Sequence, residues 1–167
     1  MPKSPRRYWL LKSEPDVFSY DDLEAAPKRQ TFWDGVRNYQ ARNTMRDDMK
    51  VGDGVLYYHS NAKPPGVIGV ARVVGEGRFD PTQFDEQDGH YDPKAKPEDP
   101  RWFGVDVEAV APFKQLISIT ELKANPALAE MALVQRGQRL SVQPVSLEHW
   151  KVVLKLGGVK TSVLSAK

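Results

Sequence analysis

The chain has 167 residues, of which 40% are apolar and 10% aromatic, so one sizeable core fits but a separate catalytic domain does not. Cysteine is absent, which excludes disulfide frameworks, cysteine nucleophiles and thiolate metal sites. The formal charge is +2, but residues 80–100 hold seven acids against two lysines, a local balance of −5 that leaves +7 on the remainder. A basic body of this kind is typical of proteins that bind polyanions.

The first residues predict a short arm followed by a buried strand. Residues 1–7 contain two prolines and three basic residues and predict a mobile arm. The apolar run Tyr8–Lys12 predicts a strand that ends at Ser13–Pro15, because proline disfavours helix in the residue before it. This run is too short for the apolar region of a signal peptide, and no later run could span a bilayer. We expect a soluble intracellular protein: cytoplasmic or nucleoid-associated in a bacterium, nuclear in a eukaryote.

A helix and a short strand should come next. Ser19 predicts a helix N-cap, because Asp21 and Asp22 follow in the first turn, and this helix should end before Pro27. Residues 31–33 predict a strand that brings Trp33 to the mouth of the sheet. Gly35 then permits a sharp turn, and residues 38–45 predict another short helix.

The segment Trp33–Asn43 concentrates side chains suited to recognition, and its polar positions outnumber the apolar ones that a core helix would need. An aromatic face can stack on a flat ring, an amide can read the edge of a heterocycle, and an arginine can meet a phosphate. The same residues also suit a plain helix start. Asn38 would then cap the helix, Trp33 and Tyr39 would pack into the core, and the arginines would be solvated.

Residues 55–59 predict a strand with Tyr57 and His59 on one side and Leu56 and Tyr58 on the other. It ends in the polar run His59–Asn61. A lone histidine in such a place is more often a hydrogen-bonded structural residue than a catalyst, since nothing completes a triad. Residues 67–74 predict a central strand, which the glycines at 66, 69, 75 and 77 should bend or bulge.

The second half begins with an acidic stretch. Residues 80–100 predict a long surface loop or ligand-covering flap with a helical turn near Thr82. Their acids do not follow the spacing of a calcium loop and are expected to be solvated. Residues 102–110 predict a strand closed by Pro112, in which Trp102 is either core or pocket rim.

Shorter elements should complete the chain. Two short helices are expected at 118–123 and 126–131. A polar turn then leads into a last strand at 140–145. Ser146 should cap a final amphipathic helix that ends at Gly157.

Seven ordered blocks extend over nearly the whole chain: Tyr8–Pro15, Trp33–Asn43, Met49–Asp53, Tyr57–Asn61, Asp99–Trp102, Val105–Val107 and Arg139–Val145. Together they resemble an EVE domain, the family of the thymocyte nuclear protein within the PUA-like superfamily, which also holds the YTH and SRA modified-base readers. The resemblance runs from about Tyr8 to Leu156. It implies one α+β domain over residues 1–167: a PUA-like β-pseudobarrel of five to six strands with short flanking helices, a mobile arm at 1–7 and an acidic loop at 80–100.

The resemblance also implies a non-catalytic module that binds DNA or RNA carrying a modified base. A base inside a duplex cannot reach a barrel mouth, so it must be flipped out or taken from a single strand. We expect a vacant slot for it beside Trp33. The residues predicted to form this pocket are Lys12, Ser13, Glu14, Pro15, Trp33, Val36, Asn38, Tyr39, His59, Ser60 and Asn61. The residues predicted to contact the nucleic-acid backbone are Arg37, Arg42, Arg46, Lys50, Arg136 and Arg139. We expect no metal, cofactor or membrane partner, and a monomer.

Two other classes of function remain open from the residues. A nuclease or nucleotide-processing hydrolase could use Lys12, Glu14, Asp34 and His59 as acid, base and electrophile. Against it, the sequence has no carboxylates paired at helical spacing, no phosphate-binding glycine loop and no zinc motif. A scaffold that binds protein partners through exposed aromatic residues is the third reading.

Overall fold

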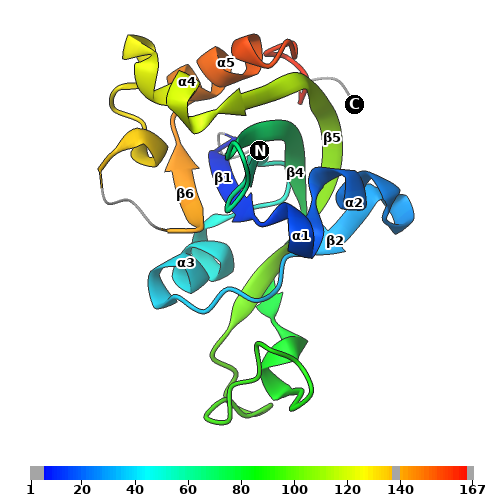
Figure 1. The fold of residues 1–167 in the computed structure, drawn as a ribbon. Helices are drawn as coiled ribbons and strands as arrows, with labels where there is room; N and C mark the ends of the chain where they lie inside the picture. The colour runs from blue at the N-terminus through cyan, green and yellow to red at the C-terminus, as the bar shows by residue number, and fades with distance from the viewer. Residues whose placement is uncertain (1–5, 137–139, 165–167) are drawn as a thin grey trace, which may run out of the picture.

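The computed structural model describes residues 6–136 and 140–164. Arg139 and most of the expected N-terminal arm therefore lie outside the described residues. Six strands form one sheet in the order β2-β5-β4-β3-β1-β6, and the sheet curls around a core while helices cover its sides (Figure 1). The strands are β1 Tyr8–Ser13, β2 Gln30–Phe32, β3 Gly54–His59, β4 Gly66–Phe79, β5 Phe103–Ser118 and β6 Val142–Val145.

The helices are short and lie between the strands. The α-helices are α1 Pro15–Phe18, α2 Tyr20–Ala25, α3 Tyr39–Asn43, α4 Ile119–Ala124 and α5 Leu147–Leu156. A π-helical turn at Thr44–Asp48 continues α3, and 3-10 turns cover Pro27–Arg29, Pro81–Phe84, Pro126–Leu128 and Ala132–Val134. The α+β class with short flanking helices is the one that the sequence predicts.

Local sequence signals explain where α2 and α5 begin. Ser19 Oγ accepts from the backbone N–H of Asp22, whose carboxylate accepts in turn from the backbone N–H of Ser19. This reciprocal capping box satisfies two N–H groups that would otherwise lack partners. Ser146 Oγ accepts from the backbone N–H of His149 and caps α5 in the simpler way. Both predicted N-caps are confirmed.

The sheet separates two hydrophobic cores because successive strand residues point to opposite faces. Trp9, Leu11 and Tyr57 belong to the first core, which α2 and α3 complete with Tyr20, Leu23 and Ala41. Leu10, Leu56 and Tyr58 belong to the second core, under α4 and α5. The predicted division of β3 into two faces is therefore confirmed.

Several predicted boundaries were wrong. Strand β5 does not close at Pro112 but continues to Ser118. Pro112 pairs with Gly69 where the register between β4 and β5 shifts, a place where a proline in a strand does least harm. Residues 126–131 form only a 3-10 turn at Pro126–Leu128, and β6 begins at Val142 rather than at residue 140.

Candidate functional site

Polar residues meet where the parallel strands β1 and β3 end. Ser13 lies beside His59 in the register of these strands, so the residues that follow each strand are neighbours. The backbone N–H of Ser60 donates to the carbonyl of Ser13 at 3.0 Å, and Asn61 Nδ2 donates to Glu14 Oε1 at 2.8 Å. Asn61 has φ +50°, a left-handed conformation that asparagine tolerates better than most residues. The fold thus brings together two segments that are forty-odd residues apart.

Hydrogen bonds to the segment after β1 hold the side chains at these strand ends. Ser13 Oγ and Tyr57 Oη both donate to the carbonyl of Phe18, at 2.7 and 2.8 Å. The backbone N–H of Tyr20 donates to His59 Nε2 at 3.1 Å. Since Nε2 accepts, the neutral imidazole carries its proton on Nδ1. Burial lowers the pKa of His59, which favours this neutral form.

Trp33 lies largely inside the first core and is only 8% exposed. Its backbone N–H donates to the carbonyl of Val105 at 2.7 Å, and its ring meets Tyr57 nearly at a right angle, with centroids 5.3 Å apart. The reading in which Trp33 packs into the core is therefore correct for most of the indole. Among the described residues, Gln143 Oε1 is the one buried side-chain polar atom without a partner. The indole N–H of Trp33, which donates no hydrogen bond within that part of the chain, therefore keeps access to solvent.

The vacant slot expected beside Trp33 does not coincide with either of two open clefts in the described part of the chain. A cleft of about 1110 Å³ lies at the opposite ends of β1 and β3 and is lined by Arg6, Lys50 and Asp53, among others. A second, of about 520 Å³, lies between β1 and the start of α5. Neither includes Trp33, so a base-sized space at this position remains a proposal.

The turn after Trp33 is bound to the acidic segment through Asp80. The side chain of Asp80 is completely buried, contrary to the prediction that the acids of this segment are solvated. Its Oδ2 accepts from Gly35 N–H at 2.7 Å and from Arg37 Nη1 at 3.0 Å, and its Oδ1 accepts from the N–H and hydroxyl of Thr82. Burial alone would raise the pKa of Asp80, but these hydrogen bonds hold it below its usual range.

Arg37 has no donor left for a ligand. Its Nε and Nη2 donate to the carbonyl of His90 at 3.0 and 2.7 Å, Nη1 donates to Val36 and Asp80, and Nη2 also reaches Thr82 Oγ1. A guanidinium group has five N–H donors, and all five are used. The prediction that Arg37 contacts a nucleic-acid backbone therefore does not fit this geometry. Arg37 instead fastens residues 80–100, which we call the flap, to the body.

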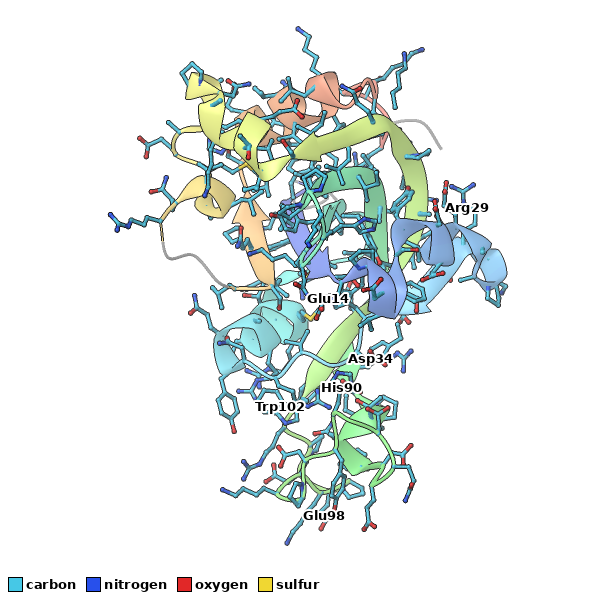
Figure 2. The ribbon with its side chains drawn as sticks, in the orientation of Figure 1. Glu14, Arg29, Asp34, His90, Glu98 and Trp102 are labelled. Carbon is cyan, nitrogen blue, oxygen red and sulfur yellow. The ribbon has the colours of Figure 1, made fainter. Side chains whose placement is uncertain are left out.

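The ring of His90, a residue of the flap, lies close to the turn at Gly35. Gly35 has φ +79°, and a Cβ added there would come within 2.7 Å of the His90 ring. In Figure 2, Asp34 and His90 lie together between the body and the flap, while Glu98 lies at the far end of the flap. Partial burial, and then the charge of Asp80, raise the pKa of Asp34.

An aromatic stack connects α3 to the base of the flap. The rings of Tyr39 and Trp102 are stacked with centroids 4.8 Å apart, Arg42 lies over Tyr39 at 4.9 Å, and Arg37 lies over Trp102 at 5.4 Å. Trp102 Nε1 donates to Asp92 Oδ2 at 2.7 Å, and this bond is the first cause that lowers the pKa of Asp92. Tyr39 was predicted to line the base pocket, but its ring is engaged by Trp102 and Arg42.

Other predicted pocket residues take different places. Lys12 points to the second face of the sheet, where its Nζ lies 5.6 Å from the Tyr58 centroid, and burial lowers its pKa. Asn38 Oδ1 accepts from the backbone N–H of Ala41 and caps α3. Val36 is buried beside Trp33 in the first core, and Pro15 begins α1.

The remaining residues predicted to contact the nucleic-acid backbone differ in whether an acidic partner lies close to their charged group. Arg46 forms two hydrogen bonds with Asp47, at 2.8 and 2.9 Å, so its guanidinium group is already paired with a carboxylate. Lys50 lines the large cleft and lies 3.8 Å from Glu76. Arg136 is exposed. Sequence reasoning missed Asp80 and Arg101, although Arg101 precedes Trp102 in one of the quoted blocks.

Metal-ligating side chains and helix lengths are two further features of the described part of the chain. No cluster of three or more histidine, aspartate or glutamate side chains there could hold a metal ion, and no helix there has the length and apolar character to cross a bilayer. The four residues of the hydrolase reading do not converge either. Lys12 lies on the other face of the sheet, and His59 Nε2 is already used.

Comparison with known proteins confirms the family resemblance. A model of the EVE domain matches residues 7–156. Thymocyte nuclear protein 1 of Rattus norvegicus is 46% identical over 171 residues, which cover 92% of this chain and 75% of that protein. The crystal structure of human THYN1 protein in complex with DNA containing 5-methylcytosine is 44% identical, with a TM-score of 0.85, and the match covers 90% of this chain and 97% of that one. A Zygosaccharomyces rouxii YTH domain in complex with N6-methyladenosine RNA is 12% identical, with a TM-score of 0.53 over 93% of this chain and 88% of that one, and shows the fold alone.

Proposed function

The chain belongs to the EVE domain family, and we propose that it is a non-catalytic module that binds nucleic acid and accommodates one modified base at the ends of β1 and β3. The observation that carries this proposal is the gathering of Trp33, Tyr57, His59, Glu14 and Asn61 at one end of the sheet. The human relative crystallised with 5-methylcytosine DNA, at 44% identity, supports DNA as the polymer and a methylated cytosine as the first ligand to test.

The groups at this end suit the edge of a base. The indole N–H of Trp33 is a donor without a partner in the described part of the chain, while Glu14 and Asp34 supply acceptors. A carboxylate can accept from the exocyclic amine of cytosine. Glu14 and Asn61 hold each other, so little conformational entropy remains to be lost when a ligand binds.

Energetics require the base to gain several contacts. Flipping a base costs a few kcal/mol, and each aromatic stack returns about 1 to 3 kcal/mol. An added methyl group contributes about 0.8 kcal/mol when it is buried. The apolar side chain of Val36, which packs with Trp33 in the first core, is the natural partner for it. Discrimination between methylated and unmethylated bases should therefore be modest, at most about tenfold.

Titration of labelled oligonucleotides with cytosine or 5-methylcytosine, single-stranded and duplex, at one fixed salt concentration tests this proposal. We expect tighter binding of the modified strand, and we expect Val36→Ala, which removes the proposed partner of the methyl group, to remove the difference. Val153→Ala is the matched control, since Val153 is also buried but belongs to the second core. Equal affinities for all bases, with salt dependence alone, would leave only a basic surface.

Location follows from the polymer that is bound. A module that reads DNA would act in the nucleus of a eukaryote, as the name of the rat relative says of that protein. In a bacterium it would act in the nucleoid.

A further inference from the structure

Five arginines of the described chain form no ion pair with an acid: Arg6, Arg7, Arg42, Arg101 and Arg136. Arg42 and Arg101 stand out among these five because they contact each other. Arg29, Arg37, Arg46, Arg72 and Arg78 each form an ion pair with a carboxylate. Within residues 6–136 and 140–164, Arg42 on α3 and Arg101 at the base of the flap form none, although they are in contact with each other. Arg42 Nη1 donates to the carbonyl of Arg101 at 2.7 Å.

Tyr39 joins the two guanidinium groups. Arg101 Nη1 donates to the Tyr39 hydroxyl at 3.3 Å, and Arg42 lies 4.9 Å above the Tyr39 ring. Arg42 also donates through Nε to Asn43, which leaves its Nη2 without a partner in the described part of the chain. Arg101 keeps both Nε and Nη2, the paired edge that binds phosphate or carboxylate in bidentate fashion.

The backbone of Arg101 is fixed before any ligand arrives. Its N–H donates to Gln83 Oε1 at 2.9 Å, and its carbonyl accepts from Arg42. Gln83 is fully buried and donates through Nε2 to the carbonyls of Asp80 and Trp102, at 2.7 and 2.9 Å. A cation on so constrained a backbone loses little entropy on binding.

We infer that Arg42 and Arg101, joined by Tyr39, form a clamp for one phosphate of the nucleic-acid strand whose base lies at the ends of β1 and β3. This inference rests on the proposed function and adds a second, sequence-independent contact to it. Phosphate suits the clamp because its several oxygens can accept from the paired Nε and Nη2 of Arg101 and from the Nη2 of Arg42. The short link from the Trp33 turn to α3 places Tyr39 and Arg42 on the same continuous segment as Trp33.

The salt dependence of binding measures the clamp. Arg101→Gln and Arg42→Gln should each weaken binding of a single-stranded oligonucleotide roughly tenfold at low salt, as expected for the loss of a hydrogen bond to a charged group. Each should also reduce the slope of log K against log salt by about 0.7. Lys151→Gln, an exposed cation on α5, removes the same charge and should leave the slope unchanged. Circular dichroism melting of every variant establishes that it is folded.

A chemical change in the ligand tests the contact itself. Oligonucleotides with one neutral methylphosphonate linkage, placed at each position in turn, should show a single position that costs affinity with the unchanged protein but not with Arg101→Gln. If the loss is the same for both proteins at every position, or if Arg101→Gln behaves like Lys151→Gln, the clamp is wrong.

The two proposals fail in different ways. A clamp variant should keep the ratio of affinities for methylated and unmethylated strands, whereas Val36→Ala should abolish it. If the clamp variants bind as tightly as the unchanged protein and the ratio is intact, the clamp alone is refuted. Absence of any oligonucleotide binding by the unchanged protein refutes both, and binding of an acidic peptide with equal dependence on Arg101 would reassign the clamp to a protein partner.

Discussion

Replacement of the buried Asp80 by asparagine should destabilise the protein by about 3 kcal/mol. The carboxylate accepts two hydrogen bonds on each oxygen, from Gly35 and Arg37 on one side and from Thr82 on the other. Asparagine has one accepting oxygen, so whichever way its amide turns, one of these pairs faces an N–H₂ group. Two hydrogen bonds are lost, the facing donors are left buried, and Arg37 loses its counter-charge.

Urea denaturation at neutral pH measures this change in the free energy of unfolding. Glu86→Gln is the matched control, because Glu86 is an exposed acid of the same flap, and its effect should stay within about 0.5 kcal/mol. A loss for Asp80→Asn no larger than that of the control would refute the structural role that we give to Asp80.

The depressed pKa of Asp80 also predicts how the effect of this substitution on the free energy of unfolding depends on pH. The folded pKa of Asp80 is depressed, so its contribution to stability is fully present above the unfolded value of about 3.9. That contribution is lost as the pH falls through the folded pKa. The difference in unfolding free energy between the unchanged protein and Asp80→Asn should therefore shrink as the solution is acidified below about pH 4.

Three further changes probe the turn, the strand ends and the flap. Gly35→Ala should lower the melting temperature, since its φ of +79° and the His90 ring both oppose a Cβ, whereas Gly89→Ala, with open space around it, should not. The folded pKa of His59 is lowered, so its neutral form stabilises the fold above the unfolded value of about 6.5 and this contribution declines as the pH falls toward the folded pKa. His59→Gln should flatten that decline in unfolding free energy between about pH 7 and 5. Glu98→Gln should change oligonucleotide affinity less than twofold at about 0.15 M salt, because charges farther than about 8 Å from the strand are screened.

Patterns that depend on neighbours in sequence could be read in advance. The alternation along Tyr57, Tyr58 and His59 predicts which side chain faces which core, because a strand has a period of two. The caps at Ser19 and Ser146 are equally local, since each serine bonds to an N–H three residues later. These signals are enough to predict the order of the elements, whereas the meeting of the two polar strand ends was implied only by the resemblance to the EVE domain.

Properties that depend on distant partners could not be read in this way. Arg37 and Arg42 are the same residue type five positions apart, yet one uses all its donors on the flap and the other keeps some free. Asp80 belongs to an acidic, aperiodic stretch that predicts solvation, and its burial arises from Gly35 and Arg37, more than forty residues earlier. Trp33 likewise belongs to a segment whose composition is typical of a binding site, but the fold buries most of its ring.

The distribution of charge within the flap shows from which side a polyanion can approach. The acids nearest the body are engaged: Asp80 by Arg37, Asp88 by His90 and Asp92 by Trp102. Glu98 lies at the far end of the flap and is exposed (Figure 2). A phosphate backbone would be attracted at the base of the flap, where Arg42 and Arg101 form no ion pair with an acid. If the proposed function holds, a bound strand would therefore lie at the base of the flap, beside the turn that carries Trp33.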